Sequence, residues 1–140
     1  MIRTVFDTNV LVSSMIRHGK PRDLWNAVLD GKIHLLVSEE ILEELISVAV
    51  RPKIVKYLGK RDMDSFLKIL LQKSELVNIK EGESLNIAED PDDNMVLQTA
   101  VVGGARYIVS GDNHLISLGS FREIKILTVA GMLKILDEQK

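Results

Sequence analysis

The stretch of sequence that decides the fold is IRTVFDTNVLVSSMI, which spans residues 2–16. Residues 2–6 form a short apolar run that predicts a buried strand, and residues 8–16 follow with a helical pattern. A single acid, Asp7, stands between the two elements. The carboxyl ends of strands form the edge at which open α/β sheets bind ligands. The stretch therefore predicts an α/β fold and places a candidate functional residue at that edge.

The same alternation of strand and helix patterns continues along the whole chain. The predicted strands are residues 2–6, 33–37, 76–79, 107–110 and 125–127. The predicted helices are residues 8–16, 21–30, 39–51, 60–73, 92–103 and 128–138. Strands that alternate with helices are typical of a mostly parallel sheet covered on both faces. The sequence thus predicts five such strands.

Length and composition bound the class of protein. The 140 residues, of which 46% are hydrophobic and 27% charged, predict a single globular domain spanning residues 1–140. The absence of cysteine excludes disulfides and thiol catalysis, and it fits a cytoplasmic location. No apolar stretch approaches the roughly 18 residues of a membrane helix, and no signal peptide leads the chain, so no membrane partner is expected. The net charge of −2 does not by itself indicate a nucleic-acid partner.

Four isolated acids lie at the edge of apolar elements or on their inner faces: Asp7, Glu44, Asp93 and Asp112. Asp7 and Asp112 follow the first and fourth predicted strands, which are neighbours if the strand order is 3-2-1-4-5. Asp93 shares a helix face with Leu97, four residues later, and therefore faces inward. Burying an isolated carboxylate costs about several kcal/mol unless something compensates for it. A divalent metal held by oxygen ligands and facing a phosphate is the most economical compensation.

Each acid also has a purely structural interpretation. Asp7 can cap the helix that follows it, although Thr8 is already a suitable cap. Asp112 can cap a short helix over NHLISL, residues 113–118. Asp93 belongs to an acidic first turn, which favours the helix dipole. Glu44 borders the apolar face of its helix, where a solvated glutamate is common, whereas the neighbouring Glu43 points further toward solvent.

Four segments taken together resemble the acidic motifs of PIN domains. They are VFDTNVLVSS (5–14), SEEILEELISVAVRPK (38–53), DPDDNMVLQTA (90–100) and YIVSGDNHLISL (107–118). They occur in the order and at the intervals of the family and cover nearly the whole chain. The resemblance is closest to the VapC-like toxin components of type II toxin–antitoxin pairs.

The resemblance implies a parallel αβα sandwich and an endoribonuclease that depends on one or two Mg²⁺ or Mn²⁺ ions. Its catalytic and metal-binding positions fall on Asp7, Glu44, Asp93 and Asp112, with polar support from Thr8, Asn9 and Ser110. Asp90 and Asp92 are additional acids beside the third position, where helical facing favours Asp93. The branch also implies an RNA substrate, a homodimer and a small antitoxin that silences the enzyme.

A basic stretch runs from the end of the third predicted helix into the start of the fourth. Its basic residues, Arg51, Lys53, Lys56, Lys60 and Arg61, form a candidate rim for contacts with RNA phosphates. The alternative is an ordinary solvated loop with exposed helix ends. Trp25 and Tyr57 are candidates for stacking on bases, although isolated aromatic residues at helical spacing usually belong to the core.

Two other functions compete with the ribonuclease. A phosphatase of the haloacid dehalogenase type also places an acid after its first strand. That chemistry requires a second Asp two residues later, where this chain has Asn9. A non-catalytic module that binds a partner through the same fold is the other alternative, and the presence of all four acids counts against it.

Overall fold

A computed structural model describes residues 1–81 and 91–139, and in these residues the strands form one six-stranded sheet of order β3-β2-β1-β4-β6-β5. The strands are β1 (Ile2–Phe6), β2 (Ile33–Ser38), β3 (Ser74–Val77), β4 (Tyr107–Val109), β5 (Ser120–Phe121) and β6 (Ile124–Leu127). Neighbouring strands are parallel except β5 and β6, which pair antiparallel. The predicted order 3-2-1-4-5 is confirmed, because the five predicted strands correspond to β1, β2, β3, β4 and β6.

The sixth strand, β5, was not expected from the sequence. It is a two-residue edge strand joined to β6 by Arg122 and Glu123, whose φ angles are 48° and 70°. Tight hairpins with positive φ at both turn residues usually carry Asn and Gly there. An Arg-Glu turn gives no such signal, and two residues are too few to show alternation.

The third predicted strand lies two residues earlier than expected. Ser74 and Glu75 open β3, where they pair with Leu35 and Leu36 of β2. Their polarity hid them in the sequence, but an edge strand faces solvent on one side and tolerates polar residues. Ile79, the expected end of the strand, belongs to the short 3-10 helix Ile79–Glu81.

The predicted helices are present with small shifts at their ends. The helices in the described residues are α1 (Thr8–Ile16), α2 (Lys20–Leu29), α3 (Glu39–Ala49), α4 (Pro52–Tyr57), α5 (Lys60–Lys73), α6 (Pro91–Gly103), α7 (Asn113–Leu118) and α8 (Val129–Glu138). The additional helix α4 begins at Pro52, which suits the first position of a helix because that position needs no backbone N–H donor.

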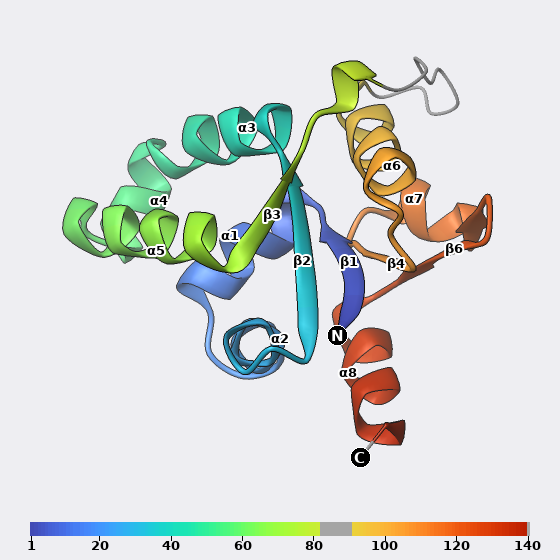
Figure 1. Cartoon of the computed structure of the whole chain (residues 1–140). Helices are drawn as coiled ribbons and strands as arrows, with labels where there is room; N and C mark the ends of the chain where they lie inside the picture. The colour runs from blue at the N-terminus through green and yellow to red at the C-terminus, as the bar shows by residue number, and fades with distance from the viewer. Residues whose placement is uncertain (82–90, 140) are drawn as a thin grey trace.

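The helices cover the sheet on both faces, as an αβα sandwich requires. Figure 1 shows α6 and α7 on one side of the strands and α1, α2 and α5 on the other. At the centre of the sheet, Val5 of β1 lies beside Leu36 of β2 and Ile108 of β4, and all three are fully buried. Helix α6 packs directly onto the sheet at Gly103, where an added Cβ would lie 2.9 Å from a methyl carbon of Leu36.

The strand order reverses at β1, which has β2 on one side and β4 on the other. A reversal of this kind is the point where open parallel sheets bind ligands, at the carboxyl ends of the strands. Helices α1 and α3 begin directly after β1 and β2, so their first turns lie at this end of the sheet. Figure 1 shows the first turn of α6 at the same end. Among the described residues, no helix has the length and apolar content needed to cross a membrane.

Candidate functional site

A cavity of about 80 Å³ lies at the carboxyl edge of the sheet and is called here the acidic pocket. Its lining consists of Asp7, Thr8, Asn9, Glu44, Asp92, Asp93, Val96 and Asp112. The four acids singled out in the sequence therefore line one cavity. They come from four places in the chain, namely the β1–α1 junction, α3, the first turn of α6 and the β4–α7 junction. The strand order accounts for this convergence, because β1 and β4 are neighbours.

Asp7 is the N-cap of α1, and its side chain is almost fully buried. Its Oδ1 accepts a hydrogen bond of 2.9 Å from the backbone N–H of Val10, and its Oδ2 accepts one from the hydroxyl of Ser110. The expectation that Thr8 would cap this helix is wrong. Thr8 is the first residue of α1, and its buried hydroxyl has no hydrogen-bond partner in the part of the chain that the structure describes.

Burial raises the pKa of the Asp7 carboxyl above its ordinary value of 3.8, because desolvation penalises the charged form. Hydrogen bonds from Ser110 and from the backbone of Val10 and Gly111 oppose this rise. Repulsion from Asp112 makes the smallest contribution to the raised pKa. Removal of water is therefore the principal cause of the raised pKa of Asp7, and repulsion between the acids is a minor one.

Ser110 connects the two acids that follow the central strands. Its hydroxyl donates to Asp7 and accepts a 2.9 Å hydrogen bond from the backbone N–H of Asp112. The Ser110 backbone is itself held by a 2.9 Å bond to the carbonyl of Leu127 on β6. Ser110 is fully buried, so its position is fixed by the sheet on both sides.

Asp112 is the N-cap of α7, where its Oδ1 accepts a 2.7 Å bond from the backbone N–H of His114. The structural interpretation of Asp7 and Asp112 as helix caps is thus correct. It does not exclude a role in the pocket, since each carboxylate has about four lone-pair positions. Capping fixes the direction of a carboxylate and leaves acceptor positions over.

The two remaining acids come from the interiors or first turns of helices. Glu44 is half-buried and lines the pocket, whereas Glu43 is exposed and does not. Asp93 is buried and Asp92 is exposed, yet both line the pocket. The position on the helix favoured Asp93 over Asp92 as the pocket residue, but the first turn of α6 places both residues at the cavity. Asp90 lies outside the described residues.

The pocket suits a divalent cation by the type of its donors and by its size. Carboxylate, hydroxyl and amide oxygens are the donors that hard cations prefer. A volume of about 80 Å³ holds an ion with a few waters, since each water occupies about 30 Å³ in the liquid. Within residues 1–81 and 91–139, no three acidic or histidine side chains already form an ion cage. The carboxylates thus surround one cavity without being gathered around a single point.

A larger cavity of about 680 Å³ adjoins the acidic pocket and is called here the α1–α4 groove. It is lined by Asn9, Val12, Ser13, Ile16, Arg17, Val48, Arg51, Lys53, Ile54 and Tyr57. Asn9 lines both cavities. Of the predicted basic rim, Arg51 and Lys53 line the groove, whereas the described side chains of Lys56 and Arg61 do not. Lys56 and Arg61 are exposed elsewhere on α4 and α5, and the side chain of Lys60 lies outside the description.

The two aromatic candidates for base stacking have opposite environments. Trp25 is buried in the core, with its ring centroid 4.7 Å from that of Phe66, so it is not accessible to a base. Tyr57 is 71% exposed and lines the groove, so the expectation of a core residue is wrong for it. Arg17 was not singled out from the sequence. Arg17 directly follows α1 as its C-cap, and an isolated arginine at a helix end gives no distinctive signal in the sequence.

Residues 3–114, which include all four acids, match the sequence model of the PIN domain family. The chain is also 36% identical, over 119 residues, to the uncharacterized protein MJ1680 of Methanocaldococcus jannaschii; the alignment covers 84% of this chain and 75% of that protein. Among solved structures, it resembles a chain in the crystal structure of VapBC2 from Rickettsia felis bound to a DNA fragment from their promoter. That match has a TM-score of 0.58 at 17% identity and covers 91% of this chain and 98% of the other. At this identity the likeness concerns the fold alone.

Proposed function

This chain belongs to the PIN domain family, and on that premise we propose that it is a Mg²⁺- or Mn²⁺-dependent endoribonuclease. PIN domains are in general nucleases, that is, hydrolases of nucleic acids. The single observation that carries the proposal is the lining of one cavity by Asp7, Glu44, Asp93 and Asp112, at the point where the strand order reverses. Four acids from four separate elements meet there.

The buried Asp7 supports a cation in this pocket. Desolvation of its carboxylate disfavours the charged form, as the raised pKa records. A bound cation reverses this cost, because an opposite charge within a few ångströms favours the ionised carboxylate. A site that keeps an acid buried at a cost to folding is typical of function rather than of stability.

The residues that would hold one or two ions are Asp7, Glu44, Asp93 and Asp112. When bound, Mg²⁺ or Mn²⁺ lowers the pKa of a coordinated water and stabilises charge on the phosphate during in-line displacement. Ser110 fixes the direction of the Asp7 carboxylate and of the Asp112 backbone. Thr8 and Asn9 supply a buried hydroxyl and an exposed amide beside the acids, available to a water or a phosphate oxygen.

We further propose that the basic rim contacts the phosphates of the substrate on either side of the cleavage point. Its members are Arg51, Lys53, Lys56, Lys60 and Arg61. Exposed lysine and arginine side chains attract RNA through its charge and without regard to its sequence. They offset the repulsion that four carboxylates exert on a phosphate.

The same proposal extends to partners. In a toxin–antitoxin pair, the antitoxin would silence the enzyme by placing an Arg or Lys among the carboxylates, where it replaces the charge of the metal. We also propose that the chain forms a homodimer. Ile46, Val50 and Val55 are 47%, 61% and 41% exposed on and beside α3 and α4. Exposed apolar surface of this kind favours association.

The proposed activity is tested by incubating the purified chain with RNA and Mg²⁺ or Mn²⁺, with EDTA as the metal-free control. Cleavage should require the metal and should be lost in Asp7→Asn, which keeps the size and the capping acceptor of the side chain. Cleavage that persists in EDTA, or that is unchanged in Asp7→Asn, would refute the metal mechanism. Release of phosphate from a small phosphomonoester, with no cleavage of RNA, would favour a phosphatase.

A further inference from the structure

The α1–α4 groove begins at the acidic pocket and follows one side of α1. Its lining residues on and just after this helix recur every three or four positions: Asn9, Val12, Ser13, Ile16 and Arg17. Residues with this spacing form a single stripe along a helix. With a rise of 1.5 Å per residue, the helical part of the stripe, from Asn9 to Ile16, is about 10 Å long, and Arg17 follows directly after the helix. Because Asn9 lines both cavities, the groove lies next to the acidic pocket.

Helices α3 and α4 form the opposite wall of the groove. Glu44 lines the acidic pocket, and Val48 and Arg51 line the groove at four and seven residues further along. These positions lie on one side of α3 and of the turn after it. Helices α1 and α3 pack against each other. Along both walls the chemistry therefore changes from polar or acidic at the pocket to basic at the far end.

The groove combines positive charge with an exposed aromatic ring. Arg17, Arg51 and Lys53 line it, and among its described lining residues none is an Asp or Glu. Three cations around one groove are a local excess on a chain of net charge −2. The ring of Tyr57 is 71% exposed at the same groove. Cations beside an exposed aromatic ring are the combination that binds the phosphates and unpaired bases of single-stranded nucleic acid.

The two cavities differ in volume and can therefore hold different parts of the substrate. The acidic pocket, at about 80 Å³, admits ions, waters and phosphate oxygens. The groove, at about 680 Å³, falls within the range of about 300–1,000 Å³ that is usual for pockets that enclose organic ligands. The sugar and base next to a phosphate at the acidic pocket therefore need space outside it, and the groove is the adjoining space.

We propose that the α1–α4 groove binds the single-stranded RNA segment on one side of the scissile phosphate. An unpaired base stacks on Tyr57, and the phosphates face the three cations. This role rests on the proposed ribonuclease activity. Stacking on Tyr57 requires a base that is free of its pairing partner. The groove thus selects RNA that is unpaired beside the cleavage point. The apolar residues of the groove also suit a helix of a protein partner. Three cations with no Asp or Glu among the described lining residues, and the nearness of the acidic pocket through Asn9, favour RNA.

Binding of a short fluorescent single-stranded RNA in EDTA, followed by anisotropy, tests this groove without requiring cleavage. Tyr57→Ala should weaken binding roughly 5- to 100-fold, because one base loses its stacking partner, and Tyr57→Phe should retain most of the affinity. Lys53→Ala should lower the slope of log affinity against log salt by about 0.7, the value for one phosphate contact on a single strand. Both side chains are exposed, so neither change disturbs the core.

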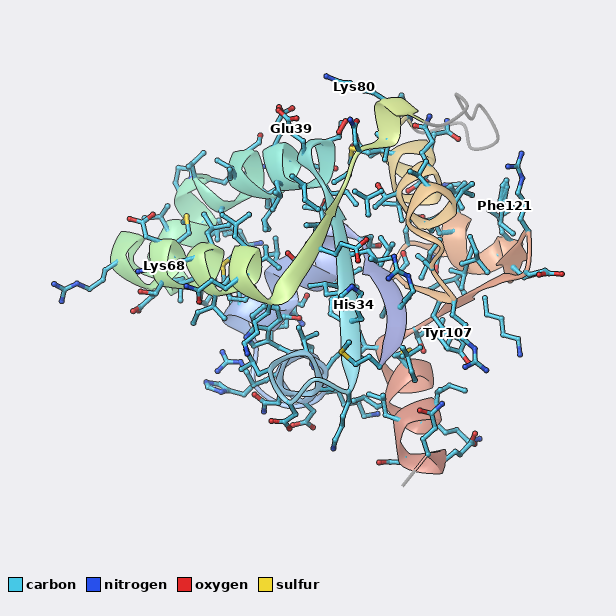
Figure 2. The ribbon with its side chains drawn as sticks, in the orientation of Figure 1. His34, Glu39, Lys68, Lys80, Tyr107 and Phe121 are labelled. Carbon is cyan, nitrogen blue, oxygen red and sulfur yellow. The ribbon has the colours of Figure 1, made fainter. Side chains whose placement is uncertain are left out.

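The matched control is Lys68→Ala, which removes the same charge from α5. Lys68, labelled on α5 in Figure 2, is exposed and does not line the groove. Its salt slope should equal that of the unmodified chain. An RNA duplex of the same sequence should bind more weakly than the single strand.

The outcomes separate this inference from the proposed activity. Cleavage with unchanged RNA binding in both Tyr57→Ala and Lys53→Ala would overturn the groove and leave the ribonuclease intact. Binding that responds to these changes as expected, in a protein that never cleaves RNA, would support the groove and refute the activity. Undetectable binding by the unmodified chain, or equal affinity for duplex and single strand, would also overturn the groove.

Discussion

The acidic pocket and the α1–α4 groove share Asn9, yet the two regions are built in different ways. In the pocket, Asp7 and Asp93 are buried, and Asp7 is held by hydrogen bonds from Ser110 and from the start of α1. In the groove the charged side chains are exposed on helix surfaces and ends. Burying a charge lowers stability, whereas an exposed charge costs almost nothing.

Function and stability are therefore coupled in the acidic pocket and independent of each other in the groove. A change in the acidic pocket should alter both the activity and the free energy of unfolding. A change in the groove should alter RNA binding, and cleavage through it, without altering the free energy of unfolding. Substitutions in the two regions therefore test this contrast.

The largest effect in this series is expected for Ser110→Ala. Loss of the hydroxyl leaves Asp7 buried without its side-chain donor, which should destabilise the fold by about 1–3 kcal/mol. It should also lower metal affinity or activity by about 10–100-fold, as is usual when a residue that orients a ligand is removed. Denaturant unfolding and RNA cleavage measure the two effects.

The matched control for Ser110→Ala is Ser117→Ala on α7, where the serine is exposed and donates to the carbonyl of Asn113. That change should leave both quantities nearly unaltered. Equal effects of the two substitutions would show that Ser110 has no special relation to the site.

The next effect concerns the two adjacent glutamates of α3. Glu44→Gln should reduce cleavage by at least about tenfold if the residue holds or orients the metal. Glu43→Gln should leave cleavage unchanged, and it should alter stability by no more than about 0.5 kcal/mol because the residue is exposed. Initial rates of RNA cleavage by the two variants measure this difference. Equal losses would mean that the face of α3 toward the pocket is wrongly assigned.

A smaller effect is expected in the pH dependence of the free energy of unfolding, to which Asp7 contributes. Below its ordinary pKa of 3.8 the carboxyl is protonated in both the folded and the unfolded chain. As the pH rises, the unfolded chain releases the proton first, because burial raises the pKa in the folded chain. The free energy of unfolding should therefore fall until the pH passes the raised value, by about 1.4 kcal/mol for each unit between the two pKa values.

Asp7→Asn removes this titration. Unfolding of both proteins in EDTA should show the advantage of Asp7→Asn growing as the pH rises above 3.8 and then levelling off. A constant difference between the two proteins, or one that shrinks as the pH rises, would contradict a desolvated Asp7.

The smallest expected effect lies at the outer part of the basic rim. Lys56 is exposed on α4 but does not line the groove, unlike Lys53 three residues before it. Lys56→Ala should therefore change the salt slope of RNA binding by less than Lys53→Ala, for which a decrease of about 0.7 is expected. Stability should be the same in both variants, as the contrast between the regions requires. A larger change in salt slope for Lys56→Ala than for Lys53→Ala would show that the RNA does not follow the groove.

Much of the fold and of the acidic pocket was predictable because the signals are local. The apolar run before Asp7 and the one before Ser110 mark strands, and an acid at the end of a buried strand stands out in the sequence. Parallel strands then bring such acids to one edge, whatever the details of packing. The hairpin at Arg122 and Glu123 lacked the usual turn residues, and β5 was therefore missed.

The groove could not be derived in the same way. Arg17 and Tyr57 are forty residues apart and become neighbours of one cavity only because α4 folds back beside α1. An exposed arginine or tyrosine on a helix carries little information by itself, since most such residues are simply solvated. Only the packing of three helices distinguishes these two from the others.

The central claim, that the acids surround a cation, is tested most directly by the melting temperature of the chain as Mn²⁺ is titrated from an EDTA-treated sample. The unmodified protein should be stabilised progressively, by about 2.7 kcal/mol when the free ion reaches one hundred times its dissociation constant. Asp7→Asn should start from a higher melting temperature, because no buried carboxylate remains at that position, and should respond far less to the ion. A melting temperature of the unmodified chain that is indifferent to millimolar Mn²⁺, or an equal response in Asp7→Asn, would contradict the account.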